Sequence, residues 1–343
     1  MTPSRLAGLL ALCLAASIPL TACRGGKPGV GLFLYNEADP YIKEFARQIL
    51  EQASASFPTV KYDAGNSQLI QNEQMEGMLA RGAALLIVNP VDRLGSYSVI
   101  QRLKAIGTPV IFFNREPLPE DLALWDKTYY VGARAEQSGQ LEASMVMKLF
   151  GGNPARLNEY DRNGDGIIQA IILKGEQGHQ DAEIRTREVL RSFEHSGFSV
   201  EVLALEIANW NRDEAYAKTE RLLADFRDRV ELVVSNNDAM ALGAISMMRQ
   251  AGMFKDSNGN GRVDRHDALW IPVVGIDGLK EAEESIAEGY LYGTVKNDSL
   301  NMAKAIVALA NTLLGHADPS TAAFPLEGGK YVWIDYRPLV TQE

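Results

Sequence analysis

The sequence has few cysteines and lacks three features that would assign it to a common class. It contains two cysteines in 343 residues. No apolar run is long enough to cross a bilayer, no stretch concentrates lysine and arginine, and no glycine-rich phosphate fingerprint stands at a strand-to-helix turn. With a formal net charge of −10, these absences argue against a membrane-spanning protein, a nucleic-acid partner and a nucleotide site.

The N-terminus is typical of an export signal. Arg5 precedes the apolar run "LAGLLALCLAASIPL", which has the length of a signal-peptide core. The following "LTAC" resembles a bacterial lipobox, so residues 1–22 are expected to be removed and Cys23 to carry lipid. An ordinary secretory signal with a chance cysteine is the alternative. Cys13 lies in the removed segment, so no disulfide is expected, and the protein should be a lipoprotein anchored outside the cytoplasm.

The remaining chain alternates short β-branched runs with amphipathic segments, which is typical of βαβ units around parallel sheets. About 320 residues suffice for two domains. Helical patterns are predicted within residues 44–57 and 72–82. The predicted strands fall into two similar sets, 30–35, 60–64, 84–90, 109–114 and 128–132, then 167–175, 199–206, 230–236, 271–276 and 290–295.

Polar side chains follow many of these strands. Ligands of open parallel sheets bind outside the carboxyl ends of the strands, so two facing sheets would form one cleft lined from both sides. Taken singly, each residue is better explained as an Asx turn or a helix N-cap than as a ligand contact, but the recurrence at the same topological place favours a site. The residues in question are Asn114, His179, Asp181, Asn237, Asp277 and Asn297.

Several segments together resemble the periplasmic galactose/glucose-binding proteins, the receptors of sugar ABC importers and chemotaxis. They are "FFNREP", "DRNGDGIIQ", "LKGEQGHQDAEIRT", "SNNDAMALGA", "PVVGIDGLKEA" and "GTVKND". The resemblance implies an α/β fold of two Rossmann-like lobes with parallel sheets joined by hinge strands, the type I periplasmic-binding-protein fold. It implies an N-terminal lobe of residues 24–133 and 297–329 and a C-terminal lobe of 134–296 and 330–343, with hinges near residues 132–134, 296–297 and 330–332.

The resemblance also implies a sugar site with ten residues. Two aromatic rings would stack on the faces of a pyranose, while carboxylates, amides, an imidazole and a guanidinium would bond its hydroxyls. Tyrosine at position 41 departs from the family, which usually has phenylalanine there. The implied residues are Asp39, Tyr41, Asn114, His179, Asp181, Arg185, Trp210, Asn237, Asp277 and Asn297.

The stretch "DRNGDGIIQ" matches the first nine positions of an EF-hand loop but lacks the glutamate of position 12, where Ile172 stands. In the family a distant glutamate completes this site, and here that residue is Glu231. The resemblance therefore implies one structural Ca²⁺ with seven oxygens. Its ligands would be Asp161, Asn163, Asp165, the carbonyl of Ile167, Gln169 and both oxygens of Glu231.

A second loop, "DSNGNGRVDRHD", has oxygen side chains at positions 1, 3, 5, 9 and 12, and Gly261 at position 6. It predicts a second Ca²⁺ site, with a polar turn before the next strand as the alternative. The family offers no guide here. The ligands would be Asp256, Asn258, Asn260, Asp264 and Asp267.

The expected function is therefore a monomeric, lipid-anchored receptor that closes on galactose or glucose and delivers it to an ABC permease, with a chemoreceptor as a further partner. A same-fold receptor for xylose or ribose is an alternative. A sugar-processing enzyme is less favoured, because no nucleophile motif is found. A DNA-binding repressor would need an N-terminal helix-turn-helix where the signal stands.

Overall fold

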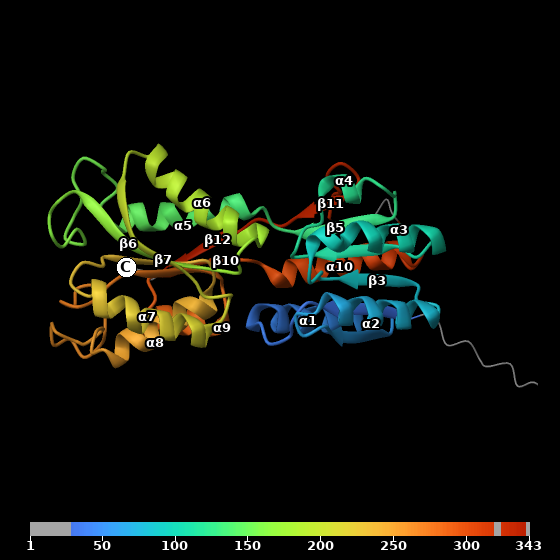
Figure 1. Cartoon of the computed structure of the whole chain (residues 1–343), viewed down its shortest axis with the longest axis horizontal. Coiled ribbons are helices and arrows are strands. Elements are labelled where there is room, and N and C mark those ends of the chain that lie inside the picture. The colour runs from blue at the N-terminus through green and yellow to red at the C-terminus, as the bar shows by residue number, and fades with distance from the viewer. Residues whose placement is uncertain (1–28, 319–323, 341–343) are drawn as a thin grey trace, which may run out of the picture.

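The computed structural model describes residues 29–318 and 324–340, and shows two α/β lobes side by side along the long axis of the molecule (Figure 1). The predicted signal peptide and Cys23 lie outside the described residues. Each lobe is built around its own six-stranded sheet. None of the helices in the described ranges combines the length and the apolar character that crossing a membrane requires.

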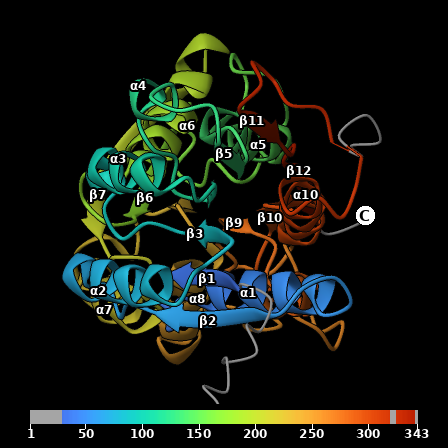
Figure 2. The same ribbon diagram turned by 90° about the vertical axis from the view of Figure 1, so that its right-hand side faces the viewer.

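The N-terminal lobe has the strand order β11-β5-β4-β3-β1-β2, with every strand parallel to its neighbours. Figure 2 shows α2 and α3 on one side of this sheet and α1 and α10 on the other. Its elements are β1 (Val30–Leu34), α1 (Pro40–Ala53), β2 (Thr59–Asp63), α2 (Gln68–Ala80), β3 (Leu85–Val88), η1 (Arg93–Gly95), α3 (Ser96–Ile106), β4 (Val110–Phe113), α4 (Pro119–Leu122), β5 (Thr128–Gly132), α10 (Ser299–Leu313) and β11 (Tyr331–Trp333).

The C-terminal lobe repeats this topology in the order β12-β10-β9-β8-β6-β7, in which only the edge strand β12 is antiparallel among the described pairs. Its elements are α5 (Ala135–Leu149), β6 (Ile167–Lys174), α6 (Gln180–His195), β7 (Ser199–Ile207), α7 (Arg212–Phe226), β8 (Leu232–Ser235), α8 (Asp238–Gln250), β9 (Val273–Asp277), α9 (Lys280–Ala287), β10 (Gly293–Lys296) and β12 (Arg337–Val340).

The chain passes between the lobes three times, after β5, after β10 and between β11 and β12. The third passage corrects one predicted boundary. Residues 330–343 were all expected in the C-terminal lobe, but Tyr331–Trp333 pairs with β5 in the N-terminal sheet. Only Arg337–Val340 joins the other sheet, as the antiparallel neighbour of β10. The crossing therefore lies between Trp333 and Arg337, a few residues later than the expected hinge.

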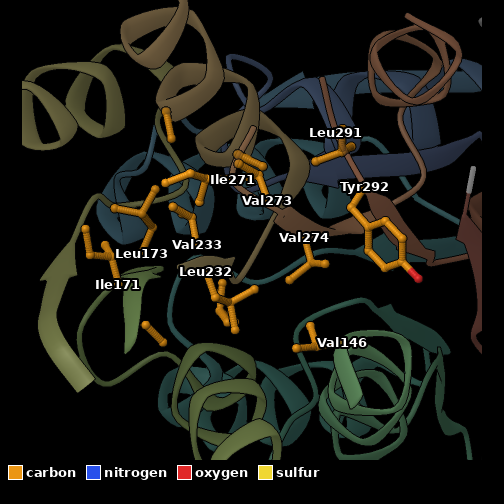
Figure 3. Close-up of a cluster of buried hydrophobic side chains, with 14 of the residues drawn as sticks. Val146, Ile171, Leu173, Leu232, Val233, Ile271, Val273, Val274, Leu291 and Tyr292 are labelled. Carbon is orange, nitrogen blue, oxygen red and sulfur yellow. The ribbon is translucent and has the colours of Figure 1, made fainter. Parts of the chain in front are cut away.

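Each lobe has a separate hydrophobic core, and this separation allows the lobes to move as units. In the C-terminal lobe, buried aliphatic side chains from the sheet meet α5 and α8, and part of this cluster is drawn in Figure 3. In the N-terminal lobe, α1 and α10 cover one face of the sheet and α2 and α3 the other. The carboxyl ends of the two sheets are left to form the interface between the lobes.

Candidate functional site: a polar cavity between the lobes

Nine of the ten residues implied as sugar ligands stand near strand ends or in the first turn of the following helix, and the tenth, Arg185, lies in the second turn of α6. Asp39, His179 and Asn237 are N-caps, and each accepts backbone N–H bonds from the start of its helix. The capping explanation is thus correct for His179 and Asn237, and Asp39 is a cap that was not predicted. Capping does not exclude a ligand role, because a cap fixes the orientation of a side chain at the mouth of the sheet.

Nine of the ten residues line one small cavity of about 30 Å³ between the lobes, to which both lobes contribute. The tenth, Asn297, does not line it. It is buried with its Oδ1 atom unpartnered, and it lines a larger groove of about 740 Å³. Tyr41 and Asp277 line both spaces, so the groove and the central cavity meet at these two side chains.

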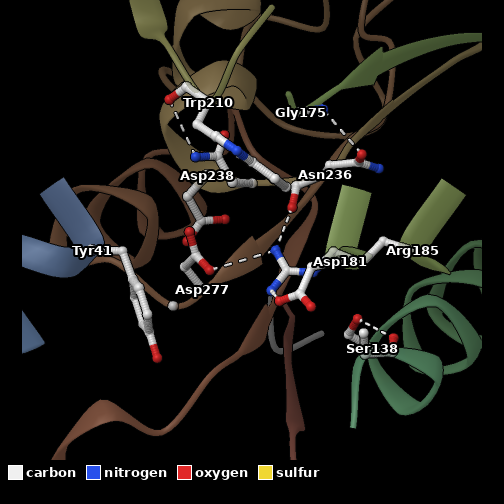
Figure 4. Close-up of polar contacts among 12 residues, drawn as sticks. Tyr41, Ser138, Gly175, Asp181, Arg185, Trp210, Asn236, Asp238 and Asp277 are labelled. Atoms are coloured by element: carbon white, nitrogen blue, oxygen red, sulfur yellow. Dashed lines mark hydrogen bonds and ion pairs between the residues drawn. The ribbon is translucent and has the colours of Figure 1, made fainter. Parts of the chain in front are cut away.

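The centre of the site is the buried guanidinium of Arg185 (Figure 4). It donates to the carbonyl oxygen of Asn236 at 2.7 Å and to the hydroxyl of Tyr336 at 3.2 Å. Two carboxylates flank it, Asp181 at 3.5 Å and Asp277 at 3.8 Å. Neither is at the distance of a strong charge-assisted hydrogen bond, so both retain the capacity to accept from a ligand's hydroxyl groups.

Burial controls the protonation of this site. It raises the pKa of Asp39 and Asp181 and raises that of Asp277 well above its usual range. Burial, together with the charges of Arg115 and Arg185, lowers the pKa of His179 well below its usual range. The imidazole is therefore neutral at pH 7, and its Nδ1 atom accepts the backbone N–H of Asp181 at 3.1 Å. The Nε2 atom then carries the proton and can donate to a ligand.

Trp210 forms one wall of the cavity and is held by several contacts. Its backbone lies at φ +63°, an uncommon value for a bulky residue, and its carbonyl accepts from the Asn237 amide at 3.3 Å. A Cβ atom on Gly175 would lie 2.3 Å from the indole ring, so this position requires glycine. The ring is thus fixed at the end of the C-terminal sheet before any ligand binds.

Other residues of the cavity were missed at the level of sequence. Tyr35 and Arg115 line it, and the Tyr35 hydroxyl donates to Asp39 at 2.6 Å. Arg115 directly follows the predicted Asn114, and Tyr35 ends the run predicted as the first strand, so both had a positional signal. Tyr336, which accepts from Arg185 but does not line the cavity, had no such signal, because it lies on the third crossing, which was placed too early.

The residues implied as the first metal site are brought together. Glu231 accepts from the backbone N–H of Arg162 at 2.6 Å and of Gln169 at 3.3 Å, so its carboxylate lies against the loop. Asp161 accepts from the N–H groups of Gly164 and Gly166, both at 2.9 Å, as position 1 of a calcium loop does. Asn163 and Gln169 direct amide N–H groups at Asp165, and an amide flip would present their oxygens instead.

The second loop repeats this hydrogen-bond pattern. Asp256 accepts from the N–H groups of Gly259 at 2.6 Å and of Gly261 at 2.8 Å. The buried Asp267 accepts from the backbone of Ser257 and Asp264. Across the described ranges, no group of three or more Asp, Glu, His or Cys side chains is placed to hold a metal. A cation at either loop would therefore need amide and carbonyl oxygens to complete its coordination shell, and Ca²⁺ accepts such donors.

The chain is similar to proteins of one family along most of its length. The family model described as a periplasmic binding protein domain matches residues 30–318. The D-galactose/methyl-galactoside binding periplasmic protein of Haemophilus influenzae is 33% identical over 287 residues, 83% of this chain and 81% of its own. The ribose import binding protein of Bacillus subtilis is 25% identical over 302 residues, 87% of this chain and 86% of its own.

A solved structure of a binding protein has the same fold. An ABC transporter solute binding protein from Bacillus halodurans with bound myo-inositol superposes with a TM-score of 0.73, at 25% sequence identity over 92% of this chain and 96% of that one. The two-lobed architecture described above is thus that of known binding proteins, and the predicted fold class is confirmed.

Proposed function

Because the chain belongs to the family of periplasmic binding protein domains, we propose that it is an extracytoplasmic receptor that binds D-galactose or D-glucose between its lobes and delivers it to an ABC importer. Membership in this family also confirms the prediction of a binding protein rather than an enzyme. The observation that carries the proposal is the single cavity lined by nine of the ten implied ligands, drawn from both lobes.

The chemistry of the cavity suits a neutral, hydroxyl-rich ring. Asp181 and Asp277 offer acceptors beside the fixed donors of Arg185, and the neutral His179 offers a further donor. Trp210 supplies an apolar face on which the CH groups of a pyranose can stack. An epimer with one hydroxyl displaced would leave one of these buried groups unpaired, which is the physical source of discrimination.

Closure of the lobes is the proposed mechanism. Ligands from both lobes contact one sugar, so the sugar binds the closed arrangement more tightly and shifts the population towards it. The three crossings would act as the hinge. The closed face would then be recognised by the permease, and a chemoreceptor as a further partner remains a prediction.

The alternative is a different small polyol in the same cavity. Relatives are described as binding ribose, and a related structure holds myo-inositol, so the fold alone does not choose. The relative that favours galactose is 33% identical, against 25% for the ribose-binding one. Calorimetric titration with galactose, glucose, xylose, ribose and myo-inositol tests this. Tightest binding of a ligand other than a hexose would refute the proposed specificity.

A structural Ca²⁺ is proposed in the loop of residues 161–169, completed by Glu231, and a second one in the loop of residues 256–267. Support comes from the shared pattern in which the first Asp of each loop accepts from the glycines at positions 4 and 6. Titration of the chelator-stripped protein with Ca²⁺ is expected to give two sites. A stoichiometry of one that is unchanged by Asp256→Ala with Asp264→Ala would refute the second.

The lipid anchor is also a proposal, since Cys23 lies outside the described residues. It rests on the "LTAC" stretch alone. Expression of the full chain in a bacterium, followed by mass spectrometry of the mature N-terminus, is expected to show a diacylglyceryl group on Cys23. A soluble product cleaved at another residue would refute it.

A further inference from the structure

Two charged residues beside the central cavity meet across the cleft. Arg115 directly follows Asn114 at the end of β4, and Glu176 lies in the loop after β6. The Nη2 atom of Arg115 lies 3.0 Å from Oε2 of Glu176, which is the distance of a hydrogen-bonded ion pair. The side chain of Arg115 is 6% exposed and that of Glu176 is 40% exposed. The contact therefore joins a buried side chain of the N-terminal lobe to a partly exposed side chain of the C-terminal lobe.

Arg115 is fixed by its own lobe. Its Nη1 atom donates to the carbonyl of Val91 at 2.5 Å, and its guanidinium carbon lies 3.8 Å from the ring centroid of Tyr35. Tyr35 in turn donates its hydroxyl to Asp39, an implied sugar ligand. The guanidinium fork is thus oriented toward its partner without any contribution from the other lobe, so little rotamer entropy remains to be lost when the pair forms.

Glu176 belongs to the turn that orients the other half of the site. Its carbonyl accepts the backbone N–H of His179 at 3.1 Å, and His179 caps α6. A second contact lies at the same edge of the cleft. The amide of Gln180, the residue after His179, donates to the carboxylate of Glu116, the residue after Arg115, at 3.1 Å. Consecutive residues of one lobe therefore reach a single loop of the other, immediately beside the cavity.

The opposite edge of the cleft is different. There α1 and α9 flank the larger groove, and the charged residues of these two helices pair within their own lobes. A pair that joins the lobes, Arg337 with Asp298 at 3.9 Å, lies at the crossing itself, where Asp298 stands just after the end of β10. Arg47 pairs with Glu44 at 2.6 Å on α1, and Lys296 pairs with Glu283 at 3.0 Å in the C-terminal lobe. These pairs can persist whether the lobes are together or apart, whereas the pair of Arg115 and Glu176 exists only when the lobes meet.

We propose that the Arg115–Glu176 pair is an interlobe bridge that sets the affinity for ligand by stabilising the closed arrangement. The inference rests on the proposed function of the cavity. Glu176 acts as a positioning residue, since it does not line the central cavity and its pair with Arg115 enters binding only through the closed population. A pair with one partner partly exposed is worth a modest factor, so loss of the bridge should raise Kd about 5-fold. The added factor should be the same for every ligand that closes the lobes.

The test is Glu176→Gln, with Glu44→Gln as the matched control. The control residue has a side chain 41% exposed, lines the groove and pairs within its own helix. Stopped-flow fluorescence and calorimetry with galactose and glucose are expected to show that E176Q raises koff and Kd by the same factor for both sugars. The association rate, the melting temperature of the sugar-free protein and the behaviour of E44Q should not change.

A double-mutant cycle assigns the effect to the pair. In an Arg115→Met background, Glu176→Gln is expected to cause no further loss, because the bridge is already absent. Small-angle scattering of the sugar-free protein is expected to show a more open average shape for E176Q than for the wild type.

The outcomes separate the two proposals. If the wild type binds neither sugar, the proposed specificity fails. If the wild type binds and E176Q retains its affinity and koff, the bridge alone is overturned. Two further results would also overturn the bridge. One is a loss of affinity in E176Q that differs between the two sugars, and the other is a loss that adds fully to that of R115M. Either result would indicate that Glu176 contacts the ligand directly.

Discussion

Asp277→Asn separates the two opposing effects of a buried carboxylate, one on binding and one on stability. Asp277 ends β9 at φ +129°, and its carboxylate lies 3.8 Å from Arg185 in the cavity. Asparagine keeps the shape and tolerates positive φ better than most residues, so the backbone is expected to stay in place. The substitution removes the charge and leaves an amide.

The magnitude follows from the two kinds of hydrogen bond. A bond from a ligand hydroxyl to a carboxylate contributes about 1.5–3 kcal/mol, and one to a neutral acceptor about 0.5–1.5 kcal/mol. The difference of about 1–2 kcal/mol corresponds to a Kd roughly 5- to 30-fold higher. Stability should move the other way or not at all. Burial holds the pKa of Asp277 well above its usual range, so its charged form is costly in the folded protein.

The assay pairs calorimetric titration of the preferred sugar with thermal unfolding of the sugar-free protein. The matched control is Asp213→Asn, an exposed carboxylate in the first turn of α7 of the same lobe, which should leave both quantities unchanged. Affinity within twofold of the wild type would refute a ligand role for Asp277. A clear fall in melting temperature would refute the view that burial of its charge opposes folding.

Further predictions concern the aromatic wall, the metal and one buried acid. Trp210→Ala should weaken sugar binding at least about tenfold and remove most of the fluorescence response. Tyr41→Phe deletes a hydroxyl 3.9 Å from the sulfur of Met302 and should change Kd less than about threefold. Fluorescence and calorimetric titration check both variants, and equal losses of affinity would contradict the assigned roles. In a background of Asp256→Ala with Asp264→Ala, which removes the proposed second site, Glu231→Gln should lower the melting temperature in calcium to the value that this background shows in excess chelator. A variant still stabilised by calcium there would exclude this ligand. Burial raises the pKa of Asp238 from 3.8 to about 6, so the folded state binds more protons between these values and stability falls as pH rises through them. Relative to Asp238→Asn, the wild type should lose about 3 kcal/mol of unfolding free energy between about pH 4 and pH 7, measured by urea denaturation, and a constant difference would contradict this.

Local pattern was sufficient to predict the strands. All ten predicted strands correspond to observed ones. Eight are mostly buried runs of apolar and β-branched residues between turn residues, and the two exposed edge strands, β2 and β7, are longer than β11 and β12. The two strands that were not predicted are β11 and β12, of three and four residues. They are short edge strands, mostly exposed or half-buried, so they lack the continuous apolar signal. Their absence from the prediction is also why the third crossing was misplaced.

The candidate site was predicted in part, and the missing part has a common cause. Asn114, Asp181 and Asp277 were found because they follow strands in a recognisable sequence context. Arg115 had a positional signal beside Asn114, but its pairing was missed because the partner, Glu176, is 61 residues away and contacts it only through the meeting of two lobes. No local pattern encodes such a pair.

The sequence by itself determined the α/β class, the two sheets and the kinds of side chain at their carboxyl ends, since these follow from hydrophobic periodicity and from a motif order that is linear along the chain. The tertiary structure decided which of those side chains face one cavity, that Asn297 lies beside it rather than in it, and that Glu231 reaches a loop some sixty residues earlier. It also decided where the lobes touch. The physical reason is that protonation, ion pairing and closure depend on distances and burial between residues far apart in sequence, and only the packed chain fixes those.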